Sequence, residues 1–266
     1  YTGNGDEKMW VGGYAEGERP GELWTFQAEG IYKSYDEIPG DLVDRSTSNS
    51  YYGGSNRTLY GPTAYANGGK KAGGLAIMPG DVKWKDVNGD GVIDNYDLVK
   101  QGNTTPKWTG GFNLSASWKG LTLSTRLDFA LGFVQYDYRT PWIMGNAQGT
   151  YNTLTNVKDT WSEDNVNAKY PIYIWADQLN ARNYTRLSSM FCYKGDYLSF
   201  REVTLSYNLP KLWLSPLHIE AVQVSVTGQN LGYICEAPSI ASPEVSSTYG
   251  GYPLPRMLVL GLNVTF

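Results

Sequence analysis

An acidic, glycine-punctuated loop that runs directly into a hairpin pattern, over residues 80–131, is the strongest constraint on what this chain can fold into. With Asp86 counted as position 1, KDVNGDGVIDNYD places side-chain oxygens at positions 1, 3, 5, 9 and 12 of a twelve-residue calcium loop. Gly91 stands at the sharp turn of such a loop, and the next residue would offer its backbone carbonyl. The predicted ligands are Asp86, Asn88, Asp90, Val92, Asp94 and Asp97.

Two features set this loop apart from a calcium-sensing EF-hand. Asp97 stands where an EF-hand carries a longer, bidentate Glu. A strand pattern, and not a helix, follows the loop. We therefore expect a structural calcium site that pins a long loop, with Ile93 pairing through its backbone and packing its side chain underneath. The alternative is an Asn/Asp/Gly-rich turn that binds no metal.

The hairpin pattern after the loop is regular. Phe112, Leu114, Ala116 and Trp118 alternate with small polar residues, and Lys119-Gly120 forms a two-residue turn in which Gly supplies a positive φ. Pairing across this turn sets Trp118 opposite Leu121, and Phe112 opposite Leu127. All the apolar side chains then lie on one face. Such a sheet suits either a soluble sandwich or a membrane barrel with a wet lumen.

Long and short connections alternate along the rest of the chain. Strands are expected over 9–14, 23–32, 197–209, 218–231 and 257–266, in addition to the hairpin within 107–133. Long polar regions cover 33–106, 134–196 and 232–254. This sorting of loops is typical of outer-membrane barrels, which have tight periplasmic turns and long extracellular loops.

The composition excludes several classes of function. A formal net charge of −4 and a pI near 5.1 argue against a nucleic-acid-binding or polybasic surface. Two cysteines and one histidine make a thiolate or imidazole metal centre improbable. His218 has no nucleophile signature near it and there is no G-x-S-x-G elbow, so we expect no enzyme. The aromatic content of 14% suits membrane-interface girdles or sugar-stacking surfaces.

Several segments together resemble the end of a SusC/RagA-type TonB-dependent outer-membrane transporter, over nearly the whole chain. They are GDVKWKDVNGDGVID (80–94), GNTTPKWTGGFNLSASWKGLTLS (102–124), GDYLSFREVTLSYNLP (195–210), VSVTGQNL (224–231), PEV (243–245) and YPLPRMLVLGLNVTF (252–266).

This resemblance implies an all-β fold, an antiparallel transmembrane barrel of 22 strands with long extracellular loops. Residues 1–266 would hold about seven of these strands, as the carboxy-terminal part, and the plug and amino-terminal regions are absent from this sequence. The resemblance implies active import of oligosaccharides or peptides across the outer membrane of a Gram-negative, Bacteroidetes-like bacterium. The implied partners are the TonB complex and a SusD-like surface lipoprotein lid, in a dimer of transporter–lipoprotein pairs. Phe266 matches the terminal aromatic of such barrels.

The barrel interpretation gives two further expectations for the extracellular end. If Leu209 faces His218, the same register sets Cys192 opposite Cys235, so an oxidising location predicts a disulfide between them. A broken register would leave two ordinary thiols. Sugar-stacking or lid contacts are one interpretation of the tryptophans in the second long loop, and packing between loops or a place at the membrane interface is the other. These tryptophans are Trp142, Trp161 and Trp175.

Two other functional classes remain open at this point. One is a soluble, calcium-stabilised β-sandwich that binds carbohydrate at the cell surface. The other is a surface glycan hydrolase, which would need a catalytic carboxylate pair. A transporter requires detergent for solubility, whereas both alternatives do not.

Overall fold

The computed structural model describes residue 17 and residues 19–45, 58–66, 75–145, 152–174, 177, 182–236, 243–244 and 254–266. The chain forms two compact units, and it passes between them more than once. The first unit comprises Tyr1–Asn103 and Tyr136–Cys192, and the second comprises Thr104–Gln135 and Tyr193–Phe266. No helix in the described part of the chain has the length and apolar character needed to cross a membrane.

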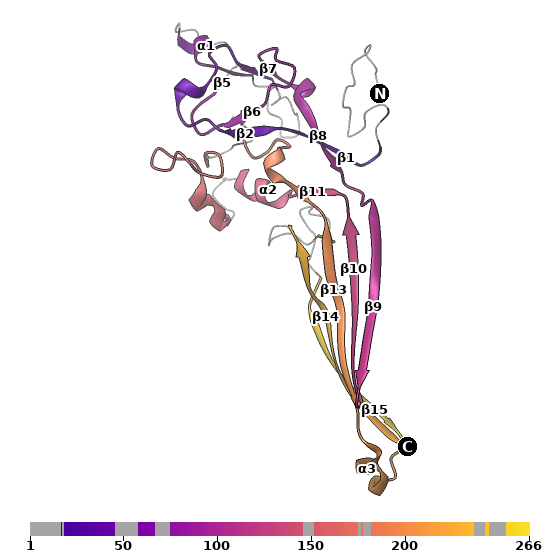
Figure 1. Cartoon of the computed structure of the whole chain (residues 1–266). Helices are drawn as coiled ribbons and strands as arrows, with labels where there is room; N and C mark the ends of the chain where they lie inside the picture. The colour runs from indigo at the N-terminus through magenta and orange to yellow at the C-terminus, as the bar shows by residue number, and fades with distance from the viewer. Residues whose placement is uncertain are drawn as a thin grey trace. The chain divides into compact units, whose positions relative to one another are not determined.

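The second unit is a five-stranded antiparallel sheet with the order β15-β14-β13-β10-β9. Each strand pairs with its neighbour along the chain, so the sheet is an up-and-down meander (Figure 1). Its edges are β9 and β15. The strand bounds are β9 Trp108–Trp118, β10 Leu121–Leu131, β13 Tyr197–Asn208, β14 Ala221–Cys235 and β15 Met257–Thr265.

The hairpin of β9 and β10 has the predicted register. Trp118 pairs with Leu121, and Phe112 pairs with Leu127. Lys119 and Gly120 have φ values of 46° and 86°, the left-handed pair of a type I′ turn. A side chain at position 120 would also approach the carbonyl oxygen of Asn208 to 3.0 Å, so Gly is required there for two reasons.

The next short connection, between β13 and β14, does not have the expected register. Helix α3 (Lys211–Leu214) and the 3-10 helix η7 (Ser215–Leu217) occupy it, and His218 ends η7 with a φ of 56°. Strand β14 therefore begins at Ala221, not at residue 218. The expectation that Leu209 faces His218 is wrong, because Asn208 pairs with Gln223 instead.

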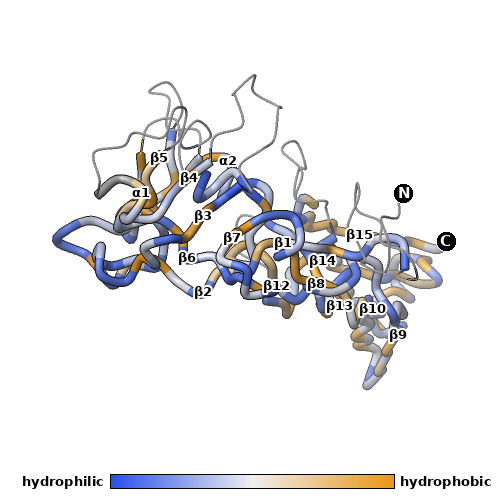
Figure 2. Tube along the Cα trace, turned by 90° about the horizontal axis from the view of Figure 1, so that it is seen from above, coloured by the Kyte–Doolittle hydropathy of each residue, from blue (hydrophilic) through white to orange (hydrophobic). Residues whose placement is uncertain are grey.

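The sheet presents one apolar face, and hydrophobic and hydrophilic residues alternate along its strands (Figure 2). The apolar side chains on this face are large and exposed: Trp118 is 70% exposed and Leu260 is 75% exposed. The same face carries Trp108, Phe112, Leu114, Leu121, Leu123, Leu131, Leu205, Val224, Val226, Ile234, Leu258 and Leu262.

Short strands build the first unit. β1 (Glu22–Phe26) pairs with β8 (Leu98–Asn103), and β2 (Ala28–Ile31) pairs with β6 (Val82–Trp84). A four-stranded sheet has the order β5 (Leu75–Ala76), β4 (Leu59–Tyr60), β3 (Val43–Asp44), β7 (Val92–Ile93).

The remaining elements are short as well. The α-helices are α1 (Thr63–Ala66) and α2 (Arg139–Gly145), and the 3-10 helices are η1 (Tyr35–Glu37), η3 (Asn95–Asp97), η4 (Thr155–Asp159) and η6 (Ser189–Phe191). Strands β11 (Val134–Tyr136) and β12 (Cys192–Lys194) pair with each other.

Buried apolar side chains form the core of the first unit. One cluster contains Phe26, Val82, Trp84 and Ile93, and Ile93 is 1% exposed. Ile93 also pairs through its backbone with Asp44, so the predicted role of this residue is confirmed. A second cluster contains Tyr32, Ile38, Leu59 and Ile77.

The all-β prediction is confirmed in its coarse form, but the number of barrel strands is not. The strand expected over 23–32 is broken at Gln27 into β1 and β2, which lie in the first unit and not in the long sheet. The strand expected over 9–14 lies outside the described residues. The described sheet thus holds five long strands, where about seven were expected.

Candidate functional site

The polar face of the five-stranded sheet is lined by hydroxyl groups that pair across strands. Ser117 and Thr122 lie 2.8 Å apart across the β9–β10 hairpin, and Ser115 and Ser124 lie 3.2 Å apart. Because side chains alternate between the faces of a strand, these pairs fall opposite the apolar rows. The face is therefore already hydrogen-bonded and hydrophilic.

A β-bulge places a charged residue at the centre of this polar face. The register between β13 and β14 shifts between Phe200 and Glu202, and the pairing of β10 with β13 shifts at the same level. Arg201 is the extra residue relative to β10, whereas β14 places two residues, Asn230 and Leu231, against it. Bulges re-aim a side chain and interrupt the ladder locally, and here the bulge lets Arg201 contact residues from both neighbouring strands.

Arg201 is held by acidic partners from two other segments. Its Nε donates to Asp128 on β10 at 2.7 Å, and its Nη1 and Nη2 donate to the two carboxylate oxygens of Glu244, the former at 3.0 Å. Asn230 on β14 accepts from Nη1 at 3.3 Å. The Tyr233 hydroxyl donates to Glu244 at 2.9 Å. Such two-point arginine–carboxylate pairs fix geometry as well as charge.

Sequence reasoning did not single out this cluster, although its residues lie in segments that carry the family resemblance. Arg201 belongs to 195–210, Asn230 to 224–231 and Glu244 to 243–245. The available signal was a break in the alternation, because Arg201 and Asn230 occupy positions of the apolar phase, in step with Val203 and Val226. That break does not identify Glu244 as the partner of Arg201. Gln135 completes the attachment by donating to the carbonyl of Pro243 at 2.8 Å.

The acidic loop folds around its own backbone amides. Asp86 accepts from the amides of Gly89 at 2.7 Å and Gly91 at 2.8 Å. Asp90 accepts from Val92 at 2.8 Å, and Asn88 accepts from the Asp90 amide at 3.1 Å. Short polar side chains stabilise turns in this way. The predicted ligands are thus brought into one loop.

Asp97 closes the loop from below. It is fully buried, and its oxygens accept from the amides of Val87 and Asp94, each at 2.8 Å. Asp94 in turn accepts from the Tyr96 amide at 2.9 Å and begins η3 as a capping box. Burial raises the pKa of Asp97, and the hydrogen bonds from the two backbone amides oppose that shift.

The donor chemistry of this loop suits a hard cation, because its side chains offer carboxylate and amide oxygens. Within the described residues, however, no three acidic, histidine or cysteine side chains converge on a point that would hold a metal ion. The carboxylates are turned toward amides, so a cation would require several of them to rotate inward. The calcium site stays a prediction.

The first unit also buries a second polar cluster, around Asp81. Its oxygens accept from the Asn183 amide group and the Met78 backbone, each at 2.8 Å. Burial raises the pKa of Asp81 to about 6, against the lowering effect of those two hydrogen bonds. Arg186 pairs with Asp44 at 2.9 Å, and its guanidinium stacks 4.6 Å from the Trp84 ring. These groups brace the unit.

The cysteines do not stand in the predicted pairing. Cys235 pairs with Tyr197 across β13 and β14, because the longer connection and the irregularity between Phe200 and Glu202 both shift the register from the expected one. Both cysteines carry free thiols. Burial raises the pKa of Cys192 to about 11, which leaves it protonated and unreactive at neutral pH.

Two of the three tryptophans of the second long loop are described. Trp161 packs against Gly80, where an added Cβ would come within 2.7 Å of the indole ring. This contact fits packing between loops. Trp142 lies half-buried in α2, and Trp175 lies outside the described residues.

No protein-family model matches the chain. The chain is 26% identical to TonB-dependent receptor P3 of Formosa agariphila over 258 residues, which cover 87% of this chain. It is 28% identical to TonB-dependent receptor P26 of the same organism over 200 residues, which cover 70% of this chain. The aligned regions span 24% and 20% of those receptors, so the chain is about a quarter of the length of these relatives.

Solved structures show the same fold. A structure of the RagAB peptide transporter superposes with a TM-score of 0.57 at 18% identity, over 92% of this chain and 23% of that one. The RagAB peptide importer in its closed-closed state gives a TM-score of 0.55 at 17% identity, with 92% and 23% coverage. The resemblance predicted from the sequence is confirmed: this chain is similar to TonB-dependent receptors, and it shares its fold with the RagAB transporter.

Proposed function

We propose that this chain contributes membrane-spanning strands to the β-barrel of a TonB-dependent outer-membrane importer. The observation that carries the proposal is the apolar face of the five-stranded sheet. In water, a row of leucines and tryptophans exposed by 40% to 75% would cost roughly 1–3 kcal/mol per side chain. Lipid is the solvent in which that exposure is favourable.

The dimensions of the strands support the same proposal. The five strands contain 9 to 15 residues, and a tilted transmembrane strand needs about 9–11. The connection between β9 and β10 has two residues, whereas β10 and β13 are joined through much of the first unit. Short turns on the periplasmic side and long segments outside the cell produce this alternation.

The polar face would line the transport pathway. Its paired hydroxyl groups make the face hydrophilic, and the charge of Arg201 is offset by Asp128 and Glu244. The face therefore has little net charge. Such a face suits a hydroxyl-rich, uncharged cargo, so we favour oligosaccharides, with peptides as the alternative cargo. The solved RagAB neighbours are described as peptide transporters or importers, which keeps peptides in consideration.

The relatives suggest which partner proteins this transporter would need. TonB-dependent receptors take their energy from the TonB complex, so we propose that partner, together with a SusD-like surface lipoprotein over the extracellular mouth. Two transporter–lipoprotein pairs would form the dimer. The barrel would lie in the outer membrane of a Gram-negative, Bacteroidetes-like bacterium, with about 22 strands in the complete protein and no enzymatic activity.

Calcium would act as a brace in this arrangement. We propose that Asp86, Asn88, Asp90, Asp94 and Asp97, with the carbonyl of Val92, bind it in the extracellular loop when millimolar calcium is present. Contacts with the ion would replace the hydrogen bonds that the carboxylates now accept from backbone amides. It would take no part in transport chemistry.

The competing function is a soluble, calcium-stabilised β-sandwich that binds carbohydrate. A sandwich buries the apolar face of each sheet against the other. The apolar side chains on β9 and β15 are not packed in that way, because Trp108 is 71% exposed and Leu262 is 70% exposed.

Solubility and uptake together test the proposal. The complete protein should require detergent for extraction and should migrate faster on gels before heating than after it. Cells that carry it should take up labelled oligosaccharide only when the TonB complex is present. Solubility without detergent, or uptake that does not depend on TonB, would refute the proposal.

A further inference from the structure

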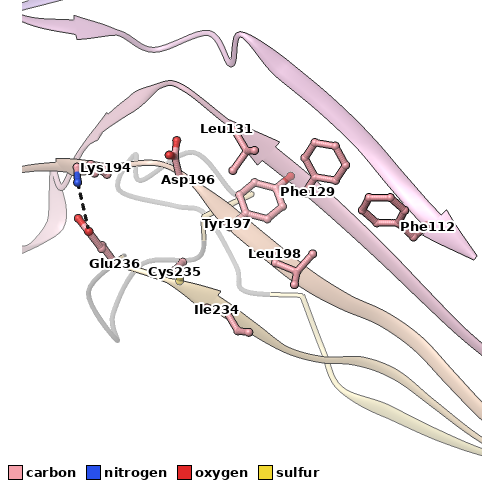
Figure 3. A pocket seen from close by; sticks show the side chains of 10 residues that line it. All are labelled: Phe112, Phe129, Leu131, Lys194, Asp196, Tyr197, Leu198, Ile234, Cys235 and Glu236. Carbon is pink, nitrogen blue, oxygen red and sulfur yellow. Dashed lines mark ion pairs between the residues drawn. The ribbon is translucent and has the colours of Figure 1, made fainter. Parts of the chain in front are cut away.

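The apolar face of the five-stranded sheet has a boundary at each end. Toward the long connections it ends in a recess of about 650 Å³ that is lined by Phe112, Phe129 and Ile234, among others (Figure 3). Beyond the recess, Lys194 and Glu236 form an exposed ion pair, with 3.8 Å between Nζ and Oε1. Charged groups thus replace apolar ones at this level of the sheet.

The boundary toward the short turns is a row of residues that crosses all five strands. In strand order, each paired with the next, the row consists of Trp118, Leu121, Tyr207, Val224 and Leu262. Two of its side chains are aromatic, and aromatic rings gather at the membrane–water interfaces of barrels. Lys119 follows Trp118 in the turn and places its Nζ 4.8 Å from the centre of the Trp118 ring.

The distance between the two boundaries fits the apolar part of a bilayer. Trp108 and Trp118 stand at the two ends of β9, and both are exposed. From residue 108 to residue 118 the strand rises by ten steps of about 3.4 Å. A strand tilted by about 40° then covers about 26 Å of membrane thickness, which matches the apolar band of an outer-membrane barrel. In a membrane, the row at Trp118 would therefore lie at the edge of the hydrocarbon.

Helix α3 lies just past this row and exposes two apolar side chains. It begins at Lys211, four residues after Tyr207. Leu212 is 84% exposed and Trp213 is 62% exposed, whereas Leu214 is 4% exposed. The helix contacts β14, so the buried Leu214 marks its inner side and keeps Leu212 and Trp213 outside. Two consecutive large apolar side chains at this level indicate a surface that meets something other than water.

We infer that α3 anchors the protein in the phospholipid leaflet on the side of the short turns. Leu212 and Trp213 enter the boundary between headgroups and acyl chains, and Lys211 beside them lies among the phosphates. Continuity with the apolar face supports this occupant, because α3 directly follows the row of Trp118 and Tyr207 and lies at the same change of solvent. This inference rests on the proposed function, since it needs the sheet to span the membrane.

Position-specific fluorescence quenching in proteoliposomes tests the inference. The complete protein, with its native cysteines replaced by serine, carries Leu212→Cys labelled with an environment-sensitive fluorophore, in vesicles of phosphatidylethanolamine and phosphatidylglycerol. We expect blue-shifted emission, strong quenching by lipids with a nitroxide near the headgroup, and little quenching by iodide on both sides of the membrane. Asn208→Cys, at the same end of the sheet but on its polar face, is the matched control and should be quenched by iodide.

A third position separates this inference from the proposed function. Leu260→Cys, in the middle of β15, should be quenched by lipids with a nitroxide in the acyl chain if the sheet spans the membrane. If residue 260 reports lipid while residue 212 is quenched by iodide, or is shielded by protein from both quenchers, the inference alone is overturned. If neither residue reports lipid, the proposed function fails with it. Heat-modifiable migration shows which variants are folded, and Trp213→Cys replaces Leu212→Cys if the latter does not fold.

Discussion

Arg201 on β13 and Glu244, 43 residues further along the chain, form a two-point ion pair on the polar face of the sheet. Their side chains are 25% and 12% exposed, so water screens the pair only in part. Asp128 adds a third charge from β10. The pair attaches the segment at 243–244 to strands that lie far from it in the sequence.

Breaking this pair should loosen that attachment. We expect Arg201→Gln and Glu244→Gln each to destabilise the sheet, with a coupling free energy of about 1–3 kcal/mol between them. Denaturant unfolding of the two single variants and the double variant in detergent micelles measures that coupling. A coupling near zero would show that the contact contributes nothing.

The chain contains a matched control for that cycle. Lys194 and Glu236 also pair, but both side chains are more than 60% exposed and their charged atoms are 3.8 Å apart. For Lys194→Gln with Glu236→Gln we expect a coupling of at most about 1 kcal/mol. Comparing the two coupling free energies shows how much of the coupling depends on burial of the charges and how much on their proximity alone.

A charge on the apolar face should prevent membrane assembly. Leu260→Arg lies in the middle of β15 and should cost about 2–4 kcal/mol in a bilayer. Asn263→Arg, on the opposite face, should be tolerated because it meets water. The fraction of protein that shows heat-modifiable migration from the outer membrane measures the effect. Equal tolerance of both changes is the outcome expected of a soluble module.

Removing calcium should expose the acidic loop if the ion binds there. With a chelator, protease cleavage within 80–100 should become faster in the wild type and not in Asp86→Ala, which has already lost a ligand. Fragment mass spectrometry over time gives the rates. Cleavage that ignores the chelator in the wild type would remove calcium from the proposal.

Asp97 should matter with or without calcium. Asp97→Ala leaves the amides of Val87 and Asp94 unpaired at a buried position, which costs about 1–3 kcal/mol for each group left without a partner. We therefore expect faster cleavage of the loop in this variant in the presence of chelator, where calcium plays no role. Asp36→Ala, on an exposed turn of the same unit, is the control and should behave like the wild type.

Asp81 should make the stability of the first unit depend on pH. The pKa of Asp81 is about 6 in the folded protein and 3.8 for a free aspartate side chain, so the folded state keeps the proton to a higher pH than the unfolded chain does. The contribution of Asp81 to the free energy of unfolding is most favourable below pH 3.8 and is lost as the pH rises to about 6. The change amounts to about 3 kcal/mol.

Hydrogen exchange of the Met78 and Val82 amides in the complete protein at several pH values measures this effect. Opening should become easier between pH 4 and 6, apart from the intrinsic exchange rate. In Asp81→Asn, which cannot titrate, this dependence should flatten. A slope that is unchanged in the variant would assign the effect to another group.

The parts of the fold that the sequence predicted are those governed by local rules. Alternation over eleven residues identified β9 and β10, and the two-residue turn left one register in which Trp118 meets Leu121. The connection after β13, from residue 209 to residue 220, is long enough to allow several registers. Because a helix and a left-handed His218 occupy part of it, the expected register was wrong, and the cysteine bridge lost the register on which it was predicted.

The first unit escaped prediction for another reason. Its strands have two to six residues, too few for a period to show, and their positions depend on contacts such as those that bury Thr25. Arg201 and Glu244 were missed because a polar residue at one position of the apolar phase does not identify the partner to which a bulge turns it. The acidic loop was recognised because its turn-forming residues act on their immediate neighbours.

The division of the chain between the two units has a consequence for folding kinetics. Strands β10 and β13 pair across a connection that runs from residue 132 to residue 196, and most of it belongs to the first unit. Closing a flexible loop of that length costs roughly 4 kcal/mol of chain entropy. If residues 136–192 fold first, the flexible part of the connection between the two strands becomes much shorter, and the entropy cost of pairing the strands falls. Substitutions deep in the first unit should then slow the insertion of strands they never touch.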